Sequence, residues 1–121
     1  MKDSECAPLE KLLNQISGQW TMYILWILDT NGVIRFGELR RKIDGISPKV
    51  LTQRLRMLEE NGIVYRHYES TIPPQVSYEL TERGKELSKP LYDLCDLASR
   101  WYGDQTKDHA RLELKIAKIG E

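Results

Sequence analysis

Six basic side chains fall within a short stretch near the middle of the chain, which contains one acidic residue, Asp44. They are Arg40, Arg41, Lys42, Lys49, Arg54 and Arg56. Guanidinium and ammonium groups neutralise phosphates, and arginine or lysine can also donate hydrogen bonds to guanine. The spacing therefore favours nucleic-acid binding, although a basic stretch on a helix is also typical of an ordinary solvated surface.

The residue types that catalysis or metal binding would need are sparse. The two histidines, His67 and His109, are isolated, and the two cysteines, Cys6 and Cys95, lack the paired spacing of a zinc site. No phosphate-binding glycine loop and no nucleophile with a partner base is visible. We therefore expect no enzyme activity, no metal and no cofactor, and any chemistry at the cysteines would be redox chemistry.

The second half of the basic stretch has clear helix signals. Ser47 can cap the free amides, Pro48 suits the first helical position and Gly62 suits the residue just past the end, which predicts a helix over 48–61. One side of this helix is apolar, with Leu51, Leu55 and Leu58. The other side should therefore face outward.

A shorter helix is predicted within 36–43, joined to the 48–61 helix by the turn Gly45-Ile46, and this layout is typical of a helix-turn-helix. The second helix of such a pair fits the major groove of DNA and places its amino-terminal side chains on base edges. In this chain those side chains are Ser47, Lys49, Val50, Thr52 and Gln53. Arg54 and Arg56 lie further along and are better placed for phosphates.

A β-hairpin is predicted after the helix-turn-helix. The segments 63–69 and 76–80 are rich in β-branched and aromatic residues and flank the loop STIPPQ. Such a hairpin can act as a wing that reaches the DNA backbone or the minor groove. The candidates for wing and backbone contacts are Arg40, Arg41, Arg54, Arg66, His67 and Gln75.

Two further segments precede the helix-turn-helix. Four apolar residues at helical spacing predict a helix over 8–17: Leu9, Leu12, Leu13 and Ile16. The apolar run 20–28 has no polar face and fits either a buried strand or a buried helix, of which we take the helix. A short extended piece is expected at 33–36.

A long helix is predicted from Thr81 onward, with a kink at Pro90. Its apolar residues form a seam over two heptads, shorter than a coiled coil requires: Leu87, Leu91, Leu94, Ala98 and Trp101. After Asp104 the apolar pattern suits a helix or a strand, and we take the helix.

The chain has 121 residues, so we expect one domain over 1–121. Its 18 basic and 18 acidic residues cancel, but segment 35–66 has a charge of +4, whereas 1–34 and 67–121 each have −2. The positive charge thus coincides with the helix-turn-helix. No apolar run approaches the ~20 residues of a membrane helix and no secretory signal is visible, so we expect a cytoplasmic protein without a membrane partner.

Three motifs resemble those of the HxlR-type transcriptional regulators, a winged-helix family related to the MarR regulators. They are Gly18-Gln19-Trp20-Thr21, the stretch RFGELRRKIDGISPKVLTQRLRMLEENGIVYR at 35–66 and YELTERG at 78–84. The resemblance implies a mainly α fold with a small β-hairpin (α+β), a winged helix-turn-helix with terminal dimerisation helices. It places the DNA-reading part at about 35–80 and dimerisation elements at about 8–17 and 81–119.

The resemblance also implies a homodimer that binds double-stranded DNA at an inverted-repeat operator. The recognition helix would carry Ser47, Pro48, Lys49, Thr52, Gln53 and Arg56, with the wing at 66–75. The dimer interface would contain Leu9, Leu12, Leu13, Ile16, Leu91, Leu94, Ala98 and Trp101, although each of these could equally belong to the subunit's own core.

Cysteine is a further point of resemblance, because some family members sense oxidants at a cysteine just before the first helix. Cys6 occupies that place and is the candidate redox sensor, with an ordinary thiol as the alternative. Cys95 is expected to be a small buried hydrophobe.

Two alternatives remain open. The chain could be a winged-helix module that binds protein through the hairpin edge and the tail, without DNA. An effector pocket lined by Trp20, Tyr23 and Trp26 is conceivable, but aromatic residues at helical spacing more often form a core. The sequence does not identify the operator, the target genes, the sign of regulation or the effector.

Overall fold

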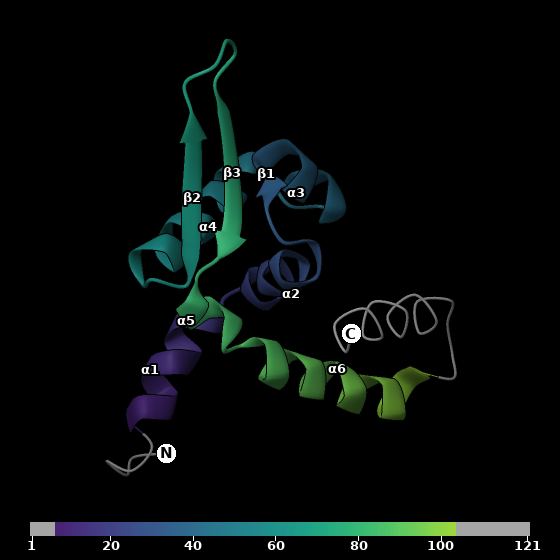
Figure 1. Ribbon diagram of the computed structural model, residues 1–121. Helices are drawn as coiled ribbons and strands as arrows, with labels where there is room; N and C mark the ends of the chain where they lie inside the picture. Colours follow the sequence, from purple (N-terminus) through teal and green to yellow (C-terminus); the bar gives the residue numbers. More distant parts are fainter. Residues whose placement is uncertain (1–6, 104–121) are drawn as a thin grey trace.

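The computed structural model describes residues 7–103, which form helices around a small sheet (Figure 1). The elements in chain order are α1 (Ala7–Ile16), α2 (Thr21–Asn31), β1 (Ile34–Arg35), α3 (Phe36–Lys42), α4 (Pro48–Glu60), β2 (Val64–Glu69), β3 (Gln75–Leu80), α5 (Glu82–Lys85) and α6 (Ser88–Tyr102). The predicted mainly α winged helix-turn-helix is confirmed. Cys6 and the tail after Asp104 lie outside the described residues.

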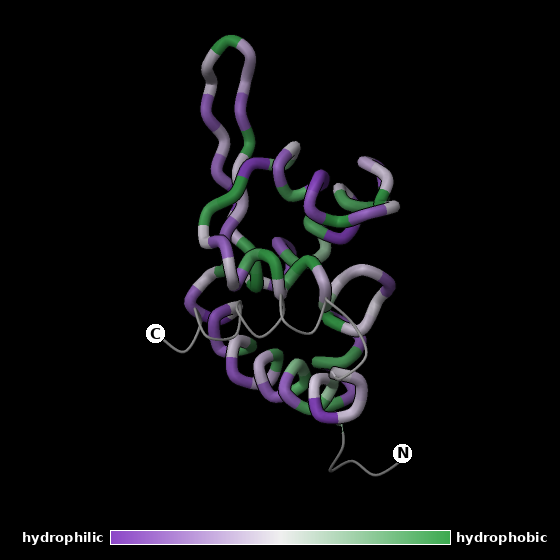
Figure 2. Tube along the Cα trace, turned by 90° about the vertical axis from the view of Figure 1, so that its right-hand side faces the viewer, coloured by the Kyte–Doolittle hydropathy of each residue, from purple (hydrophilic) through white to green (hydrophobic). Residues whose placement is uncertain are grey.

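The sheet is antiparallel, with the strands in the order β1-β3-β2. β2 and β3 pair along their full length, from Val64 opposite Leu80 to Glu69 opposite Gln75. β1 pairs with β3 at only two positions, Ile34 with Tyr78 and Arg35 with Ser77. The outer part of the hairpin therefore has no third strand beside it, and it stands clear of the body (Figures 1 and 2).

α2 is the centre of the core. Its side chains Ile24, Leu25, Ile27 and Leu28 are buried almost completely. This explains why the sequence of this segment has no polar face, because a helix surrounded by protein needs none. The structure confirms the helix over the strand; Trp26 belongs to the core, whereas Tyr23 is exposed.

α4 begins and ends where its local signals predicted. The Ser47 hydroxyl accepts a hydrogen bond from the Val50 amide at 3.1 Å, and Pro48 is the first helical residue. Gly62 adopts the left-handed conformation (φ 73°) that lets the chain leave the helix toward β2. The apolar stripe of the helix is buried in full: Leu51, Leu55 and Leu58.

The prediction of one long helix from Thr81 was wrong. Thr81 caps only α5, through a hydrogen bond from the Gly84 amide at 3.0 Å, and α6 begins separately at Ser88. Pro90 accounts for the break, because within a continuous helix its ring would clash with the carbonyl of Glu86. Starting at Ser88 places Pro90 in the first turn, where an amide donor is not needed, so the proline does not kink α6.

Gly84 is the closest approach between α5 and the sheet. A Cβ built on this residue would lie 2.1 Å from the Ile63 carbonyl oxygen, which already accepts a hydrogen bond from the Thr81 amide at 3.0 Å. The contact brings the backbone of α5 directly against the residue before β2, and the Thr81 hydroxyl donates hydrogen bonds to the Gly62 and Ile63 carbonyl oxygens beside it. Only glycine fits without moving one of the two segments.

We expect Gly84→Ala to lower the free energy of unfolding by about 3 kcal/mol, because the added methyl group must push two backbone segments apart. The measurement is chemical denaturation followed by circular dichroism. Gly37→Ala is the matched control, since the nearest atom to its Cβ, on Arg41, is 3.7 Å away. That variant should keep or slightly raise stability, by up to ~1 kcal/mol, as expected for Gly to Ala in a helix. Equal stability of the two variants would contradict the packing argument.

Candidate nucleic-acid interface

The outward side of α4 carries polar and basic side chains. Burial of the α4 leucines fixes the orientation of the helix about its own axis. Lys49, Gln53 and Arg56, on the opposite side, are therefore exposed. Ser47 and Pro48 at its start are exposed as well, and Thr52 is half-buried. The predicted recognition residues therefore share one surface. Val50 departs from the prediction, because it packs against the core and is not free for a base edge.

The basic residues of this surface have no acidic partner within the part of the chain that the structure describes. Arg40 and Arg41 are exposed in the last turn of α3, where positive charge also suits the helix dipole. Between residues 7 and 103, the ion pairs are His67–Glu79, Lys85–Glu82, Lys89–Asp93 and Arg100–Asp96. Lys49 and Arg56, like the two α3 arginines, are in none of them. Their charge is available to an external anion.

Arg54 has a different position from the one predicted. Its Nε donates a hydrogen bond to the Gln19 carbonyl oxygen at 2.9 Å, and its side chain is half-buried. Two residues along a helix differ by about 200° in direction, so Arg54 and Arg56 cannot share a face. Arg54 ties α4 to the turn before α2, which favours a structural role for this side chain over the predicted phosphate contact.

Arg66 and His67, two of the predicted wing contacts, lie on opposite faces of the hairpin. Arg66 lies opposite Tyr78 and its guanidinium is 5.6 Å from the Tyr68 ring centre, on the face turned toward the helices. His67 lies on the other face, where its Nε2 is 2.6 Å from Glu79 Oε2. Since His67 has a partner within the sheet, a structural role in the wing is favoured over the predicted DNA contact. Gln75 is half-buried at the start of β3.

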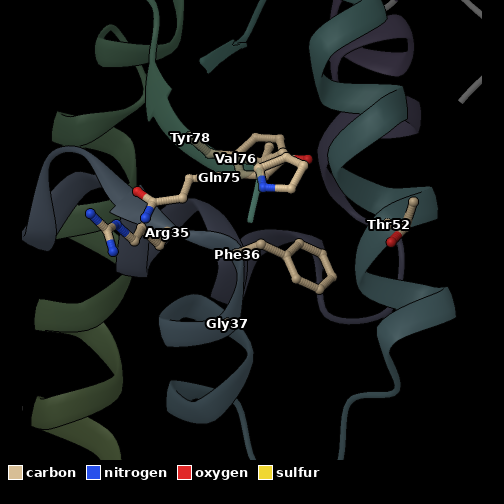
Figure 3. A pocket seen from close by; sticks show the side chains of 8 residues that line it. Arg35, Phe36, Gly37, Thr52, Gln75, Val76 and Tyr78 are labelled. Carbon is tan, nitrogen blue, oxygen red and sulfur yellow. The ribbon is translucent and has the colours of Figure 1, made fainter. Parts of the chain in front are cut away.

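Arg35 was missed by the sequence analysis. It is exposed, immediately precedes α3, and lies close to Gln75 at one end of a cleft between the hairpin and the helix pair (Figure 3). Arg35 contributes to the positive charge of segment 35–66, but it lies five residues before Arg40, the first of the six clustered basic side chains.

Comparison with known proteins agrees with this geometry. A model of the HxlR-like helix-turn-helix family matches residues 15–106. The chain belongs to this family. The family resemblance drawn from the three sequence motifs is thereby confirmed.

Individual relatives are similar over most of their length. The uncharacterised HTH-type transcriptional regulator YtcD of Bacillus subtilis is 41% identical over 100 aligned positions, and the match covers 79% of each chain. A candidate MarR-family regulator of Enterococcus faecalis superposes with a TM-score of 0.72 at 34% identity, over 87% of this chain and 94% of the other. The redox regulator HypR in its reduced form gives a TM-score of 0.73 at 34% identity, over 78% and 92%. All three are named as regulators rather than enzymes.

The residues predicted for an HxlR-type dimer interface divide into two groups. Exposed side chains are Leu9, Leu12, Leu13, Leu94, Ala98 and Trp101. Ile16 and Leu91 are instead buried in the core of the single chain, which is the alternative that the sequence left open for each of these residues. On α6 the division arises because the helix leaves the body after its first turns (Figure 1), and on α1 the buried residue, Ile16, is the last of the helix.

The cysteine within the described part of this HxlR-like chain is Cys95. It is half-buried in α6 and packs against the core, as expected of a small hydrophobe. Burial raises the pKa of the Cys95 thiol above its usual value, because the thiolate loses hydration. Within residues 7–103 no three acidic, histidine or cysteine side chains gather as metal ligands, and no helix there is long and apolar enough to cross a membrane.

We expect Cys95 to react slowly with iodoacetamide. In a Cys6→Ser variant, where it is the remaining thiol, its alkylation should be slower at pH 8 than that of a free-cysteine peptide, because a raised pKa leaves less thiolate. The rate–pH profile should shift to higher pH, and unfolding in denaturant should restore the peptide's profile. The same profile for the folded variant and the peptide would contradict the effect of burial.

Proposed function

We propose that this HxlR-like chain is a sequence-specific, DNA-binding transcriptional regulator that acts as a homodimer on an inverted-repeat operator. The observation that carries the proposal is the orientation of α4, whose buried leucines turn Lys49, Gln53 and Arg56 to the outside. Side chains of these types read base edges and neutralise phosphates, and a helix of this kind fits the major groove.

Each part of the surface has a role in this proposal. Lys49, Thr52 and Gln53, in the first turns of α4, approach base edges, while Arg56 holds a phosphate. Arg40, Arg41 and Arg66 add backbone contacts from α3 and from the wing. Phosphate contacts supply affinity and position, whereas the base contacts supply specificity.

The homodimer is supported by exposed apolar side chains on the two terminal helices. On α1, Leu9, Leu12 and Leu13 are exposed by 38–46%, and on α6, Leu94 and Trp101 are exposed by 49% and 65%. Apolar residues repeated along helices in this way need a partner to cover them. A second copy that covers both helices would give two recognition helices related by a two-fold axis, which matches an inverted repeat.

DNA binding through this surface should depend steeply on salt. For a promoter-derived duplex we expect the slope of log K against log salt concentration to be less steep by about 0.9 in Arg56→Gln than in the parent. The reason is that each phosphate contact releases counterions, and the variant lacks one such contact per recognition helix. Arg54→Gln is the matched control, which should lose thermal stability but keep the slope, since Arg54 holds Gln19. Fluorescence anisotropy between 50 and 300 mM salt measures the slope for each variant, and thermal denaturation measures its stability.

A flat salt dependence, or equal affinity for the promoter duplex and a scrambled duplex, would overturn DNA reading and favour a protein-binding module. If Arg54→Gln changed the slope as much as Arg56→Gln does, the division of roles along α4 would be wrong.

Cys6 is the thiol that we propose for a redox response. It directly precedes α1 in the sequence, Cys95 is half-buried with a raised pKa, and the similar protein HypR is named a redox regulator. If Cys6 of one protomer pairs with a thiol of the other, the two thiols lose two electrons and two protons to the oxidant and form a disulfide. A cross-link between protomers would change the relative orientation of the recognition helices.

Diamide should therefore change the operator affinity of the parent protein but not that of Cys6→Ser. The response of Cys95→Ser identifies the partner thiol, because it is kept if Cys6 pairs with Cys6 and lost if Cys6 pairs with Cys95. Anisotropy before and after treatment gives the affinities, and a non-reducing gel detects the linked dimer. Recovery with dithiothreitol is the control for irreversible damage. A Cys6→Ser protein that responds as the parent does would eliminate the role of Cys6.

A further inference from the structure

The tip of the wing is apolar and uncharged. β2 and β3 pair as far as Glu69 opposite Gln75, so residues 70–74 form the loop that joins the two strands. Every residue of this loop is exposed, and Ile72 is exposed completely, at 101%. Figure 2 shows the apolar tip between two largely hydrophilic strands. A single exposed apolar side chain is ordinary on a protein surface, so the surroundings of Ile72 decide what it can bind.

The loop holds Ile72 in one direction. Pro73 and Pro74 follow it, and a proline ring fixes its own φ and restricts the backbone of the residue before it. On the other side of Ile72, the Thr71 hydroxyl donates a hydrogen bond to the Pro73 carbonyl oxygen at 2.8 Å. A tip restricted in this way loses little conformational freedom when it meets a partner, and this lowers the entropic cost of binding.

The wing loop lies beside the recognition helix. Pro74, at the end of the loop, and Thr52, in the first turns of α4, line the same cleft (Figure 3). The hairpin as a whole stands clear of the helices, and the loop is its farthest part (Figure 1). When α4 occupies a major groove, an extension at its side reaches across the phosphate backbone to the adjacent minor groove.

The charge of the wing argues against a tip that grips phosphates. Loop 70–74 has no charged residue, and the charged side chain nearest to it in the sequence is the acidic Glu69. Arg66 lies further back, with its guanidinium 5.6 Å from the Tyr68 ring centre. Lysine or arginine at the tip would be needed to neutralise phosphates or to enter a narrow A-tract groove, whose negative potential repels an acid. What this tip offers to DNA is apolar surface.

We propose that Ile72 acts as an apolar wedge, which enters the minor groove beside each half-site and inserts between two stacked base pairs. The inference rests on the proposed function and adds how the wing meets DNA. Branched apolar side chains that enter a minor groove partly unstack one base step and bend the duplex toward the major groove. The DNA contributes a deformable step in place of a hydrogen-bonding pattern.

The wedge gives the wing a sequence preference without any hydrogen bond to base edges. Pyrimidine–purine steps such as TA and CA unstack most easily, so the energy of deformation is lowest where Ile72 meets one of them. α4 reads the half-site through Lys49, Thr52 and Gln53, and Ile72 selects the step that flanks it. Ile72 is therefore a specificity-determining residue.

The test selects duplexes from a random pool with the full-length parent and, separately, with Ile72→Ala, and sequences both products. The parent should enrich inverted half-sites flanked by a pyrimidine–purine step, whereas Ile72→Ala should enrich the same half-sites without a preferred flanking step. On the best duplex of the parent, the Kd of Ile72→Ala should be roughly tenfold higher, because most of the buried isoleucine surface is lost.

Two further measurements distinguish a wedge from a phosphate contact. Energy transfer between dyes at the two ends of the duplex should show a smaller bend with Ile72→Ala, since the base step is no longer unstacked. The slope of log K against log salt concentration should stay that of the parent, because an apolar contact releases no counterions. Ile72→Leu, which keeps a branched apolar side chain, should retain the bend and the preference for the flanking step.

Val33→Ala is the matched control. Val33 is also an exposed β-branched side chain (58%), but it lies before β1, away from the wing loop. This variant should bind DNA as the parent does. Thermal unfolding of the three variants should match that of the parent, since neither Val33 nor Ile72 is part of the core.

The wedge would be overturned by the same flanking preference in Ile72→Ala and the parent, by an unchanged bend, or by a loss of affinity with a less steep salt slope, which would place the tip on phosphates. An equal loss of affinity in Val33→Ala would overturn it too, since the effect would not depend on the tip. A parent that enriches no duplex would overturn the proposed function, and the wedge with it. Enriched half-sites without a flanking step would overturn the wedge alone.

Discussion

Burial of the three α4 leucines is the constraint on which the reading surface depends. Leu51, Leu55 and Leu58 lie at 1% exposure or less, and each side chain contributes roughly 1.5–3 kcal/mol when it leaves water. Rotating α4 by even a third of a turn would expose part of this stripe. Since helical residues advance by about 100°, the direction of every other side chain follows, so Arg56 faces outward and Arg54 faces the turn before α2.

Local signals were enough to predict α4 and the hairpin, because the residues that delimit them act within a few positions. Ser47 caps the amide three residues on, and Gly62 ends the helix by its own backbone conformation. The partners of Arg54 and His67 could not be predicted in this way, since Gln19 and Glu79 are 35 and 12 residues distant in the chain. Two arginines of the same helix, Arg54 and Arg56, therefore have different surroundings in the fold, which their sequence positions alone did not predict.

The spacing of apolar residues predicted which face of α6 is apolar, but not which residues of that face are buried in the core. Leu87 and Leu91 lie in the core, whereas Leu94, Ala98 and Trp101 continue the same seam into solvent. A repeat along a helix records which side is apolar, and the length of the body against which it packs decides which residues are covered. For the same reason, only the exposed residues of this α6 seam, from Leu94 onward, are available for an interface with another chain.

The recognition helix and the wing are held by different means. α4 is tied to the turn after α1 by Arg54, and the Trp20 indole, 3.6 Å from the position of a Cβ on Gly45, joins that turn to the one between α3 and α4. Trp20 adopts a left-handed backbone (φ 74°), which costs a non-glycine residue about 1 kcal/mol or more, and its packing offsets this strain. The outer wing has no comparable tie, because β1 supports β3 at only two positions. α4 is therefore fixed to the body of the protein at the Gln19–Trp20 turn, whereas the outer wing is held only by the pairing of β2 with β3.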